Sequence, residues 1–580
     1  MLKVLKTFYR FLLVYKTYFT VFIFLVVVST VIENLNPYVY KLLINAIPDK
    51  NYFLLFKLVL LFVAATEISS LLNTLSYYVG DKVLIPAARD ARIKIFKKVQ
   101  DLDFAFHVTK STGSLISAFK RGDGSFFDLF HNLLQGIFRT VLSLLVLVFF
   151  FSQITPLIAI LMLLIFVGNS FVGWGLIKRN IKSRLEFNES EDNISGIITD
   201  NLINYETVKF FAQEKEEERR LTENFKTWSK NLWRYTNSFR AIDVTVGTFS
   251  NLGILLVFWI VIKKLVAGQI TTGDFVMVVS FTSSFYYRFF DLVYNSRNIA
   301  KNYADIERYF SILDNETLVK DPVVPAVPEK VKGEIKFEGV SFVYPDSEAE
   351  ILQEMSLVIN KGESVAFVGR SGAGKTTVVK LLLRFYDVTK GKIFLDGIDI
   401  KEFTKSQLRS YIGLVPQEPV LFNNTLGYNL AYGHSNATQK QIEKVVKMAN
   451  LYEFIESLPM KYETQVGERG IKLSGGQKQR LAIARMLLID PKIIIFDEAT
   501  SNLDSESERL IQDSLWKIAK GKTVLIIAHR FSTIRRVDRI IVMDKGRIVD
   551  IGSHKELKAK EEGLYRYLWQ LQARGDIEVD

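Results

Sequence analysis

Uncharged apolar runs are concentrated in the first 300 residues of the chain. Those at residues 17–32, 141–151, 157–168 and 250–262 contain no Asp, Glu, Lys or Arg. After residue 330, charged side chains are evenly dispersed. Because uncharged runs of this kind are typical of membrane spans, the pattern predicts that the first half of the chain lies in lipid and the second half in water.

The same pattern predicts six helices in the first half. We expect them at residues 17–47, 52–100, 111–151, 155–210, 220–266 and 272–313. An α-helix rises ~1.5 Å per residue, so about fifty residues reach ~75 Å, well beyond a ~30 Å hydrocarbon core. The surplus length of the longest helices must therefore project into the cytoplasm.

Lys and Arg predict the orientation of these helices. The N-terminus, residues 82–121 and residues 178–240 are rich in both, whereas the turns at 48–51 and 152–155 are nearly bare. Basic loops stay on the cytoplasmic side, so both termini are expected there. The apolar run after the basic N-terminus has no small-residue cleavage site, which favours a retained first span over a signal peptide.

Composition excludes several other classes of site. The net charge of +12 is explained by basic cytoplasmic loops, so nucleic-acid binding is not expected. The chain has no cysteine, which excludes disulfides, thiolate zinc sites and cysteine-ligated iron–sulfur clusters. Its five histidines show no metal-ligand spacing.

Four ionisable residues fall inside the predicted spans, roughly equally deep below the outer turns: Glu33, Glu67, Arg139 and Arg288. Charges inside a membrane are costly and call for an explanation. One hypothesis is a polar belt that lines a central cavity and binds substrate. The other is ion pairs that lock the bundle, and Asp291, one turn from Arg288, is a further candidate partner. The sequence leaves both open, together with the question of which residues line the cavity.

Two short segments interrupt the cytoplasmic extensions, at residues 103–113 and 204–211. Both combine turn residues with exposed aromatic residues. Long helices need a partner that braces them, so we expect both segments to be docking elements. A plain loop is the alternative for the first.

A proline-rich connector then separates two domains. Residues 314–333 carry prolines at every third position from Pro322 to Pro328, which is typical of an extended, semi-rigid linker. We expect a transmembrane domain at 1–313, the linker at 314–333 and a water-soluble α/β domain at 334–580.

A glycine-rich turn opens the chemistry of the second domain. Residues 365–368 read as a buried strand, followed by Gly369-Arg-Ser-Gly-Ala-Gly374 and then Lys375-Thr376 at the start of a helix. This is the pattern of a phosphate-binding loop, in which backbone N–H groups and the helix N-terminus cradle an anion. Lys375 is expected to pair with the β- and γ-phosphates of a nucleotide, and the Thr376 hydroxyl to ligate Mg²⁺.

Further residues along the chain fit the same chemistry. The apolar strand at 493–496 ends in Asp497, which suits a Mg²⁺ shell, and Glu498, which is placed to polarise an attacking water. Tyr344 ends an alternating strand, where it either stacks on adenine or is simply buried. Ser474-Gly-Gly-Gln477 opens a basic helix and forms a second anion cradle, which must serve another nucleotide.

These motifs together resemble the ATP-binding cassette family. GRSGAGKTT, VPQEP, LSGGQ, IIIFDE, SNLD and IIAHR occur in that family's order, and the six-span half resembles that of ABC exporter half-transporters of the B type. The resemblance covers nearly the whole chain. It implies an α-helical transmembrane exporter domain followed by an α/β P-loop NTPase cassette.

The resemblance also implies roles for individual residues. Glu498, His529 and Lys375 would be catalytic, and Thr376, Gln417 and Asp497 would hold Mg²⁺. Asp504 would span a dimer seam, and residues 103–113 and 204–211 match coupling helices. The residues expected to bind ATP are Tyr344, Gly369, Arg370, Ser371, Gly372, Ala373, Gly374, Lys375, Thr376, Thr377, Gln417, Ser474, Gly475, Gly476, Gln477 and Asp504.

The implied function is an ATP-driven exporter that works by alternating access. Intact motifs favour a homodimer, although a heterodimer is also possible. The expected substrates are lipids, drugs or other amphipathic molecules. Residues 204–217 are similar to the branch that exports glutathione conjugates or heavy metals, but the sixth span lacks that branch's proline- and glycine-containing pattern. An ATP-gated channel or regulatory subunit is the rival. No Arg-rich presequence is present, which favours a bacterial cell membrane.

Overall fold

The computed structural model describes residues 2–109, 112–434, 436–467, 470, 472–497, 515–527 and 534–573. The chain divides into two compact units. The helical unit comprises residues 1–101 and 110–315, and the α/β unit comprises residues 102–109 and 316–580.

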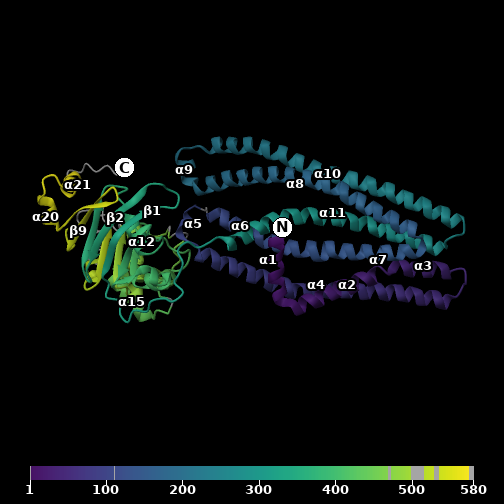
Figure 1. The fold of residues 1–580 in the computed structure, drawn as a ribbon, viewed down its shortest axis with the longest axis horizontal. Helices are drawn as coiled ribbons and strands as arrows, with labels where there is room; N and C mark the ends of the chain where they lie inside the picture. The colour runs from purple at the N-terminus through teal and green to yellow at the C-terminus, as the bar shows by residue number, and fades with distance from the viewer. Residues whose placement is uncertain are drawn as a thin grey trace. The chain divides into compact units, whose positions relative to one another are not determined.

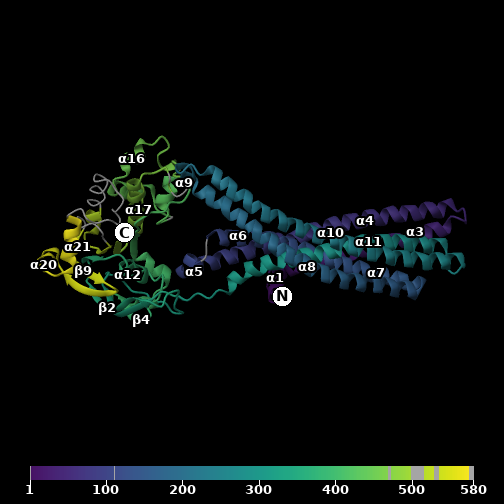
Figure 2. The ribbon, with the colours of Figure 1, turned by 90° about the horizontal axis from the view of Figure 1, so that it is seen from above.

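Long helices that run side by side build the helical unit (Figures 1 and 2). They are α1 (Leu2–Leu12), α2 (Lys16–Glu33), α3 (Asn36–Ala46), α4 (Tyr52–Asp101), α6 (Thr112–Phe130), α7 (Phe138–Ile154), α8 (Pro156–Ile203), α9 (Tyr205–Phe210), α10 (Glu214–Val266) and α11 (Thr272–Asp314). Helix α2 packs along α4, and α8 packs along α10.

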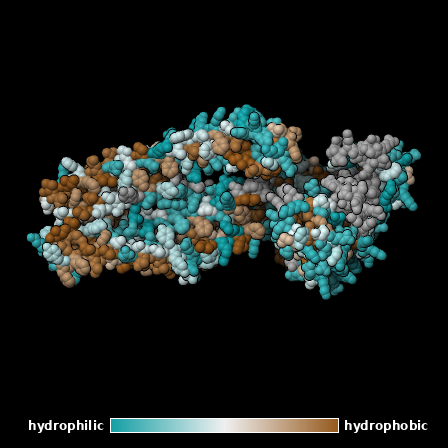
Figure 3. Space-filling model, turned by 180° about the vertical axis from the view of Figure 1, so that it is seen from behind, coloured by the Kyte–Doolittle hydropathy of each residue, from teal (hydrophilic) through white to brown (hydrophobic). Residues whose placement is uncertain are grey.

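Among the described residues, five helical stretches are long and apolar enough to cross a membrane: Lys3–Ala46, Tyr52–Asp101, Ala118–Ile154, Pro156–Ile203 and Glu214–Val266. Helix α11 is comparably long but carries Arg288, Asp291 and many hydroxyl side chains. Figure 3 shows apolar residues gathered over one end of the helical unit. This arrangement is compatible with the six predicted spans.

Three predicted helices are interrupted. The first breaks at Asn34–Leu35, because Pro37 in the first turn of α3 cannot donate a backbone hydrogen bond to the preceding turn. The third contains a π-helical segment, His131–Ile137, between α6 and α7. The fourth ends at Ile203, so that α9 is a separate helix.

Helix α1 was not predicted. Its Val4, Phe8 and Leu12 are buried, and the Phe8 ring lies 4.8 Å from that of Phe126. Figure 1 shows that α1 runs across the direction of α4. The basic residues that looked like the start of a span therefore belong to a transverse amphipathic helix.

Two sheets form the centre of the α/β unit. The smaller has the order β2-β1-β4-β5 and is antiparallel, with β1 (Ile335–Val343), β2 (Glu350–Ile359), β4 (Lys390–Leu395) and β5 (Ile398–Asp399). The larger has the order β10-β9-β3-β8-β7-β6. Its strands are β3 (Ser364–Gly369), β6 (Ile412–Val415), β7 (Ile493–Asp497), β8 (Thr523–Ile527), β9 (Arg539–Asp544) and β10 (Arg547–Gly552).

Helices cover both faces of the larger sheet. They include α12 (Lys375–Leu382), α13 (Lys405–Ser410), α14 (Leu426–Ala431), α15 (Gln439–Met448), α16 (Tyr452–Ser457), α17 (Gly475–Ile489), α20 (His554–Ala559) and α21 (Leu564–Ala573). Strand β7 shows why the run 493–496 is continuously apolar. Ile494 and Phe496 belong to one core, whereas Ile493 and Ile495 belong to the core on the opposite face.

Candidate functional site

The glycine-rich turn forms the predicted strand–loop–helix. Strand β3 ends at Gly369 and α12 begins at Lys375. Gly372 and Gly374 have φ values of +76° and +98°, which favour glycine. A Cβ on Gly374 would lie 2.7 Å from Leu352 Cδ2, and one on Gly369 would clash with the Met543 carbonyl oxygen. The close packing of this backbone explains the glycines and leaves an anion cradle at the start of α12.

The cradle faces solvent. Arg370, Ser371 and Thr376 are exposed, whereas Ala373 and Thr377 are buried beneath the loop. The Lys375 side chain folds over the loop. Its Nζ donates to the carbonyl oxygens of Gly369 at 2.8 Å and Arg370 at 3.0 Å. A cation therefore lies at the glycine loop, which fits a polyphosphate.

Parallel strands bring several predicted residues to one edge of the larger sheet. Strand β3 pairs with β8, β8 with β7, and β7 with β6, all in parallel. The carboxyl ends of these strands lead to the glycine loop, to Asp497 and to the exposed Gln417, which follows β6 by two residues. The predicted catalytic residues Glu498 and His529, and Asp504, lie outside the described residues.

Tyr344 follows the last residue of β1 and is half-buried. Its hydroxyl lies 3.1 Å from Thr377 Oγ1 in α12, and its ring makes edge contacts with Phe342 at 4.9 Å and Tyr386 at 5.2 Å. Thr377 therefore ties the tyrosine to the helix that begins at the cradle.

The second predicted cradle is the N-terminus of α17. Ser474 and Gln477 form a reciprocal cap: Gln477 N donates to Ser474 Oγ at 3.3 Å, and Ser474 N donates to Gln477 Oε1 at 2.9 Å. Ser474 and Gly475 are exposed, whereas Gly476 is buried. The serine-led turn is thus presented to solvent.

The first predicted docking element belongs to the α/β unit. Helix α5 (Phe104–Thr109) packs there through Phe104, whose ring stacks on Phe385 at 4.9 Å. Asp103 is buried and accepts hydrogen bonds from the backbone N–H groups of Leu318 and, at 3.1 Å, Val319. Helix α5 is thus part of the α/β unit, whereas docking roles for the full segments 103–113 and 204–211 stay predictions.

In the helical unit, Glu33 is shared by two arginines. Its Oε2 lies 2.5 Å from Arg139 Nη2, and its Oε1 lies 2.7 Å from Arg288 Nη2. Arg139 also donates to Asn73 Oδ1 at 2.9 Å. The network joins α2, α4, α7 and α11. Glu67 is exposed and makes no ion pair in the described part of the chain, so this network includes three of the four residues.

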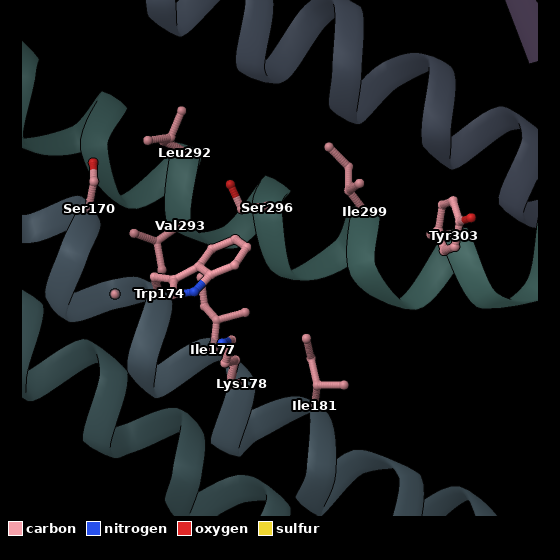
Figure 4. A pocket seen from close by; sticks show the side chains of 11 residues that line it. Ser170, Trp174, Ile177, Lys178, Ile181, Leu292, Val293, Ser296, Ile299 and Tyr303 are labelled. Atoms are coloured by element: carbon pink, nitrogen blue, oxygen red, sulfur yellow. The ribbon is translucent and has the colours of Figure 1, made fainter. Parts of the chain in front are cut away.

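A cavity of about 500 Å³ lies between α8 and α11 (Figure 4). Its walls are mainly apolar and include Trp174 and Ile177 on α8 and Val293 on α11. Lys178 contributes an ammonium group, 5.5 Å from the Trp174 ring centroid. Sequence analysis missed this cavity because an all-apolar span does not show which of its faces turns toward a neighbouring helix.

Known proteins share these features. The family model "ABC transporter" matches residues 352–501, and the model "ABC transporter transmembrane region" matches residues 19–289. A solved structure, a bacterial Atm1-family ABC exporter with ATP bound, superposes with a TM-score of 0.87 and 32% identity, covering 97% of this chain and 99% of that one.

Three curated relatives match over most of this chain. Heavy metal tolerance factor 1 of Caenorhabditis elegans is 34% identical, over 95% of this chain and 69% of its own length. ATP-binding cassette sub-family B member 6 of Mus musculus is 37% identical, over 85% of this chain and 58% of its own length. The ATM1-type heavy metal exporter of Novosphingobium aromaticivorans is 35% identical, over 88% and 84%. The chain thus spans 58–84% of the lengths of these relatives.

The fold and the glycine-loop site define an ATP-hydrolysing membrane exporter. The chain belongs to the ABC transporter family, as a half-transporter of the B type that resembles Atm1-type exporters. The predicted fold class, the family and the ATPase activity are confirmed. The protein is embedded in a membrane and binds ATP.

Proposed function

We propose that two copies of this chain form the working exporter. Each copy presents to solvent the outer part of the glycine loop, including Arg370 and Ser371, and a serine-led helix N-terminus at Ser474. One triphosphate sandwiched between the two would bury both surfaces. Because one chain type carries both intact motifs, a homodimer provides two equivalent sites.

Within each site, the residues divide by the group that they contact. Lys375 and the loop backbone hold the β- and γ-phosphates, Tyr344 stacks on adenine, and the partner copy's serine-led turn closes on the γ-phosphate. Thr376, Gln417 and Asp497 would hold Mg²⁺, whose oxygen ligands they match in type. Glu498 orients the attacking water, and His529 contacts the γ-phosphate.

Glu498→Gln tests this site. The variant should bind ATP, lose turnover by about 10³-fold or more and accumulate as a nucleotide-bound dimer, as seen by retention of ATP through gel filtration. Lys375→Ala is the matched control, because it should lose ATP binding as well. Undiminished hydrolysis by Glu498→Gln would overturn the assignment of Glu498.

We propose that the cargo is a heavy metal carried as an anionic thiol conjugate, such as a glutathione complex. The relatives named for heavy metals support this class. The chain has no cysteine, so it offers a thiophilic metal no thiolate, which favours a metal that arrives already bound by the thiolates of a carrier. Two arginines share the single carboxylate of Glu33, which leaves excess positive charge for an anion.

Inverted vesicles that contain the purified protein test the cargo. With ATP in the medium outside the vesicles, they should accumulate cadmium–glutathione against its gradient. Cadmium alone or glutathione alone should be taken up more slowly. The control is the same vesicle with Glu498→Gln. Equal uptake of free cadmium would contradict the conjugate, and flux that only dissipates gradients would favour a channel.

The α8–α11 cavity favours a second candidate. Its apolar walls and single ammonium group fit an amphipathic molecule with a negative head, such as a lipid. Stimulation of ATPase activity by such amphiphiles, without stimulation by thiol conjugates, would support this alternative.

For location, we propose a bacterial cell membrane with both termini in the cytoplasm. The basic segments 82–121 and 178–240 support this orientation of the termini.

A further inference from the structure

Helix α12 makes three contacts within eight residues. It begins with Lys375 of the phosphate cradle. Two residues later, Thr377 Oγ1 lies 3.1 Å from the Tyr344 hydroxyl. Lys380, in the last turn, lies 5.6 Å from the ring centroid of Tyr344 and 5.8 Å from that of Phe104. One ammonium group thus lies within cation–π distance of both rings.

Tyr386 provides a second link between the rings of Tyr344 and Phe104. The Tyr386 ring lies edge-on to Tyr344 at 5.2 Å and edge-on to Phe104 at 6.0 Å. Tyr386 is only 8% exposed, and burial raises the pKa of its phenol, so the ring stays neutral. Phe104 also stacks on Phe385 at 4.9 Å. Tyr344 and Phe104 are therefore joined through two bridging residues, Lys380 and Tyr386.

Phe104 connects this cluster to the membrane helices through the chain itself. It is the first residue of α5, which follows α4 by two residues and precedes α6 by two. The buried Asp103 fixes the start of α5 through the backbone of Leu318 and Val319. Helix α5 is therefore the segment of chain that lies between α4 and α6.

We propose that the base of the nucleotide, and not the phosphates alone, sets the position of α5. This inference rests on the proposed stacking of adenine on Tyr344. A base stacked on Tyr344 holds that ring against Lys380 and Tyr386, and they in turn hold Phe104. Lys380 and Tyr386 are positioning residues, since they act through the two rings. If the cluster only packed the core, the position of α5 would not depend on whether the ligand carries a base.

Hydrogen–deuterium exchange of α5 in the full-length protein in nanodiscs tests the proposal. The ligands are ADP, UDP and pyrophosphate with Mg²⁺, each at a concentration that protects the 369–377 peptide equally. Diphosphates avoid the closed dimer that ATP would produce. ADP should slow exchange of the 104–109 amides by about fivefold or more, UDP less, and pyrophosphate not at all.

Variants separate the bridge from the binding site. Lys380→Met and Tyr386→Leu should bind ADP within about threefold of the unaltered protein but lose the protection of α5. Lys336→Met is the control, because its ammonium lies over Phe394, outside this cluster. Protection by pyrophosphate equal to that by ADP, or retained protection in both variants, would overturn the proposal.

A different result would overturn the proposed nucleotide site. Tyr344→Leu should weaken ADP binding by about tenfold, as expected for the loss of base stacking, and abolish the protection of α5. If Tyr344→Leu binds ADP like the unaltered protein, the adenine contact of Tyr344 is wrong. The two failures can be told apart. If Lys380→Met binds ADP normally but loses the protection of α5, the nucleotide site is intact and only the link from Tyr344 to α5 has been broken.

Discussion

Glu33 shows how one carboxylate organises the charged residues of the helical unit. Each of its oxygens accepts from a different arginine, on α7 and on α11. The side chains of Arg139 and Arg288 are 18% and 21% exposed, against 39% for Glu33. The pairs are therefore partly shielded, and removal of the shared partner leaves two cations close together.

We expect Glu33→Gln to destabilise the helical unit by ~1–3 kcal/mol. Loss of one partner of a buried pair costs about 3–5 kcal/mol, and the partial exposure of Glu33 lowers that figure. Thermal unfolding in detergent measures the effect. Glu67→Gln, at an exposed position outside the network, should leave the midpoint unchanged.

The double variant decides between the two hypotheses for these charges. If Glu33 mainly locks the helices, adding Arg139→Gln to Glu33→Gln should restore part of the lost stability. If the arginines mainly bind an anionic cargo, Arg288→Gln should instead raise the cargo concentration that half-maximally stimulates ATPase activity. An effect on neither quantity would contradict both.

At the scale of elements, α1 provides a basic surface beside the first span. Its Lys6 and Arg10 are exposed, while the opposite side of the helix is buried. Leu13 and Val14, just beyond its end, are 52% and 66% exposed. A transverse helix with basic and apolar exposed groups is typical of a membrane interface.

We expect the double variant Lys6→Glu/Arg10→Glu to need more anionic lipid for full ATPase activity. Each basic residue near an anionic bilayer contributes about 1 kcal/mol, and reversal turns attraction into repulsion. A titration of phosphatidylglycerol in nanodiscs measures the shift. Lys440→Glu, exposed on α15 of the α/β unit, is the control, and identical titrations for both variants would rule out this role of α1.

At the scale of the whole molecule, the two exposed cradles predict complementation between copies. Lys375→Ala should inactivate the site on its own chain, and Ser474→Ala the site on its partner. A dimer of one Lys375→Ala chain and one Ser474→Ala chain then retains one complete site, whereas either homodimer retains none.

Co-purified mixed dimers with two affinity tags test this arrangement. We expect hydrolysis at about half the rate of the unaltered dimer, or less if the two sites cooperate. Each variant purified alone should be near background. Ser474→Ala also removes a helix cap worth about 1 kcal/mol, so its folding must be checked by thermal unfolding. Inactive mixed dimers with well-folded chains would contradict shared sites.

Short stretches of sequence predict much of the architecture. The strand at 493–496, the glycine loop with Lys375 and the helix that starts after Ser474 were all predicted and occur in the structure. Local steric rules and hydropathy act over a few residues, which is why these elements can be recognised without their neighbours. The order of the motifs then indicated the family.

The sequence did not show which residues are partners in the long-range contacts. The ion pairs of Glu33 span more than a hundred residues along the chain, and Glu67 looked equivalent until its exposure was known. The break at Asn34–Leu35 and the transverse α1 were equally hidden.

The sequence by itself therefore determined the elements, the lipid and water halves, and the nucleotide chemistry, because glycine conformation, charge and apolar run length act locally. Only the tertiary structure decided which helix faces meet, which arginines share Glu33 and how Tyr344 connects to Phe104. In apolar helices many faces are nearly equal in hydropathy, so their pairing depends on side-chain packing among segments that are distant in the chain.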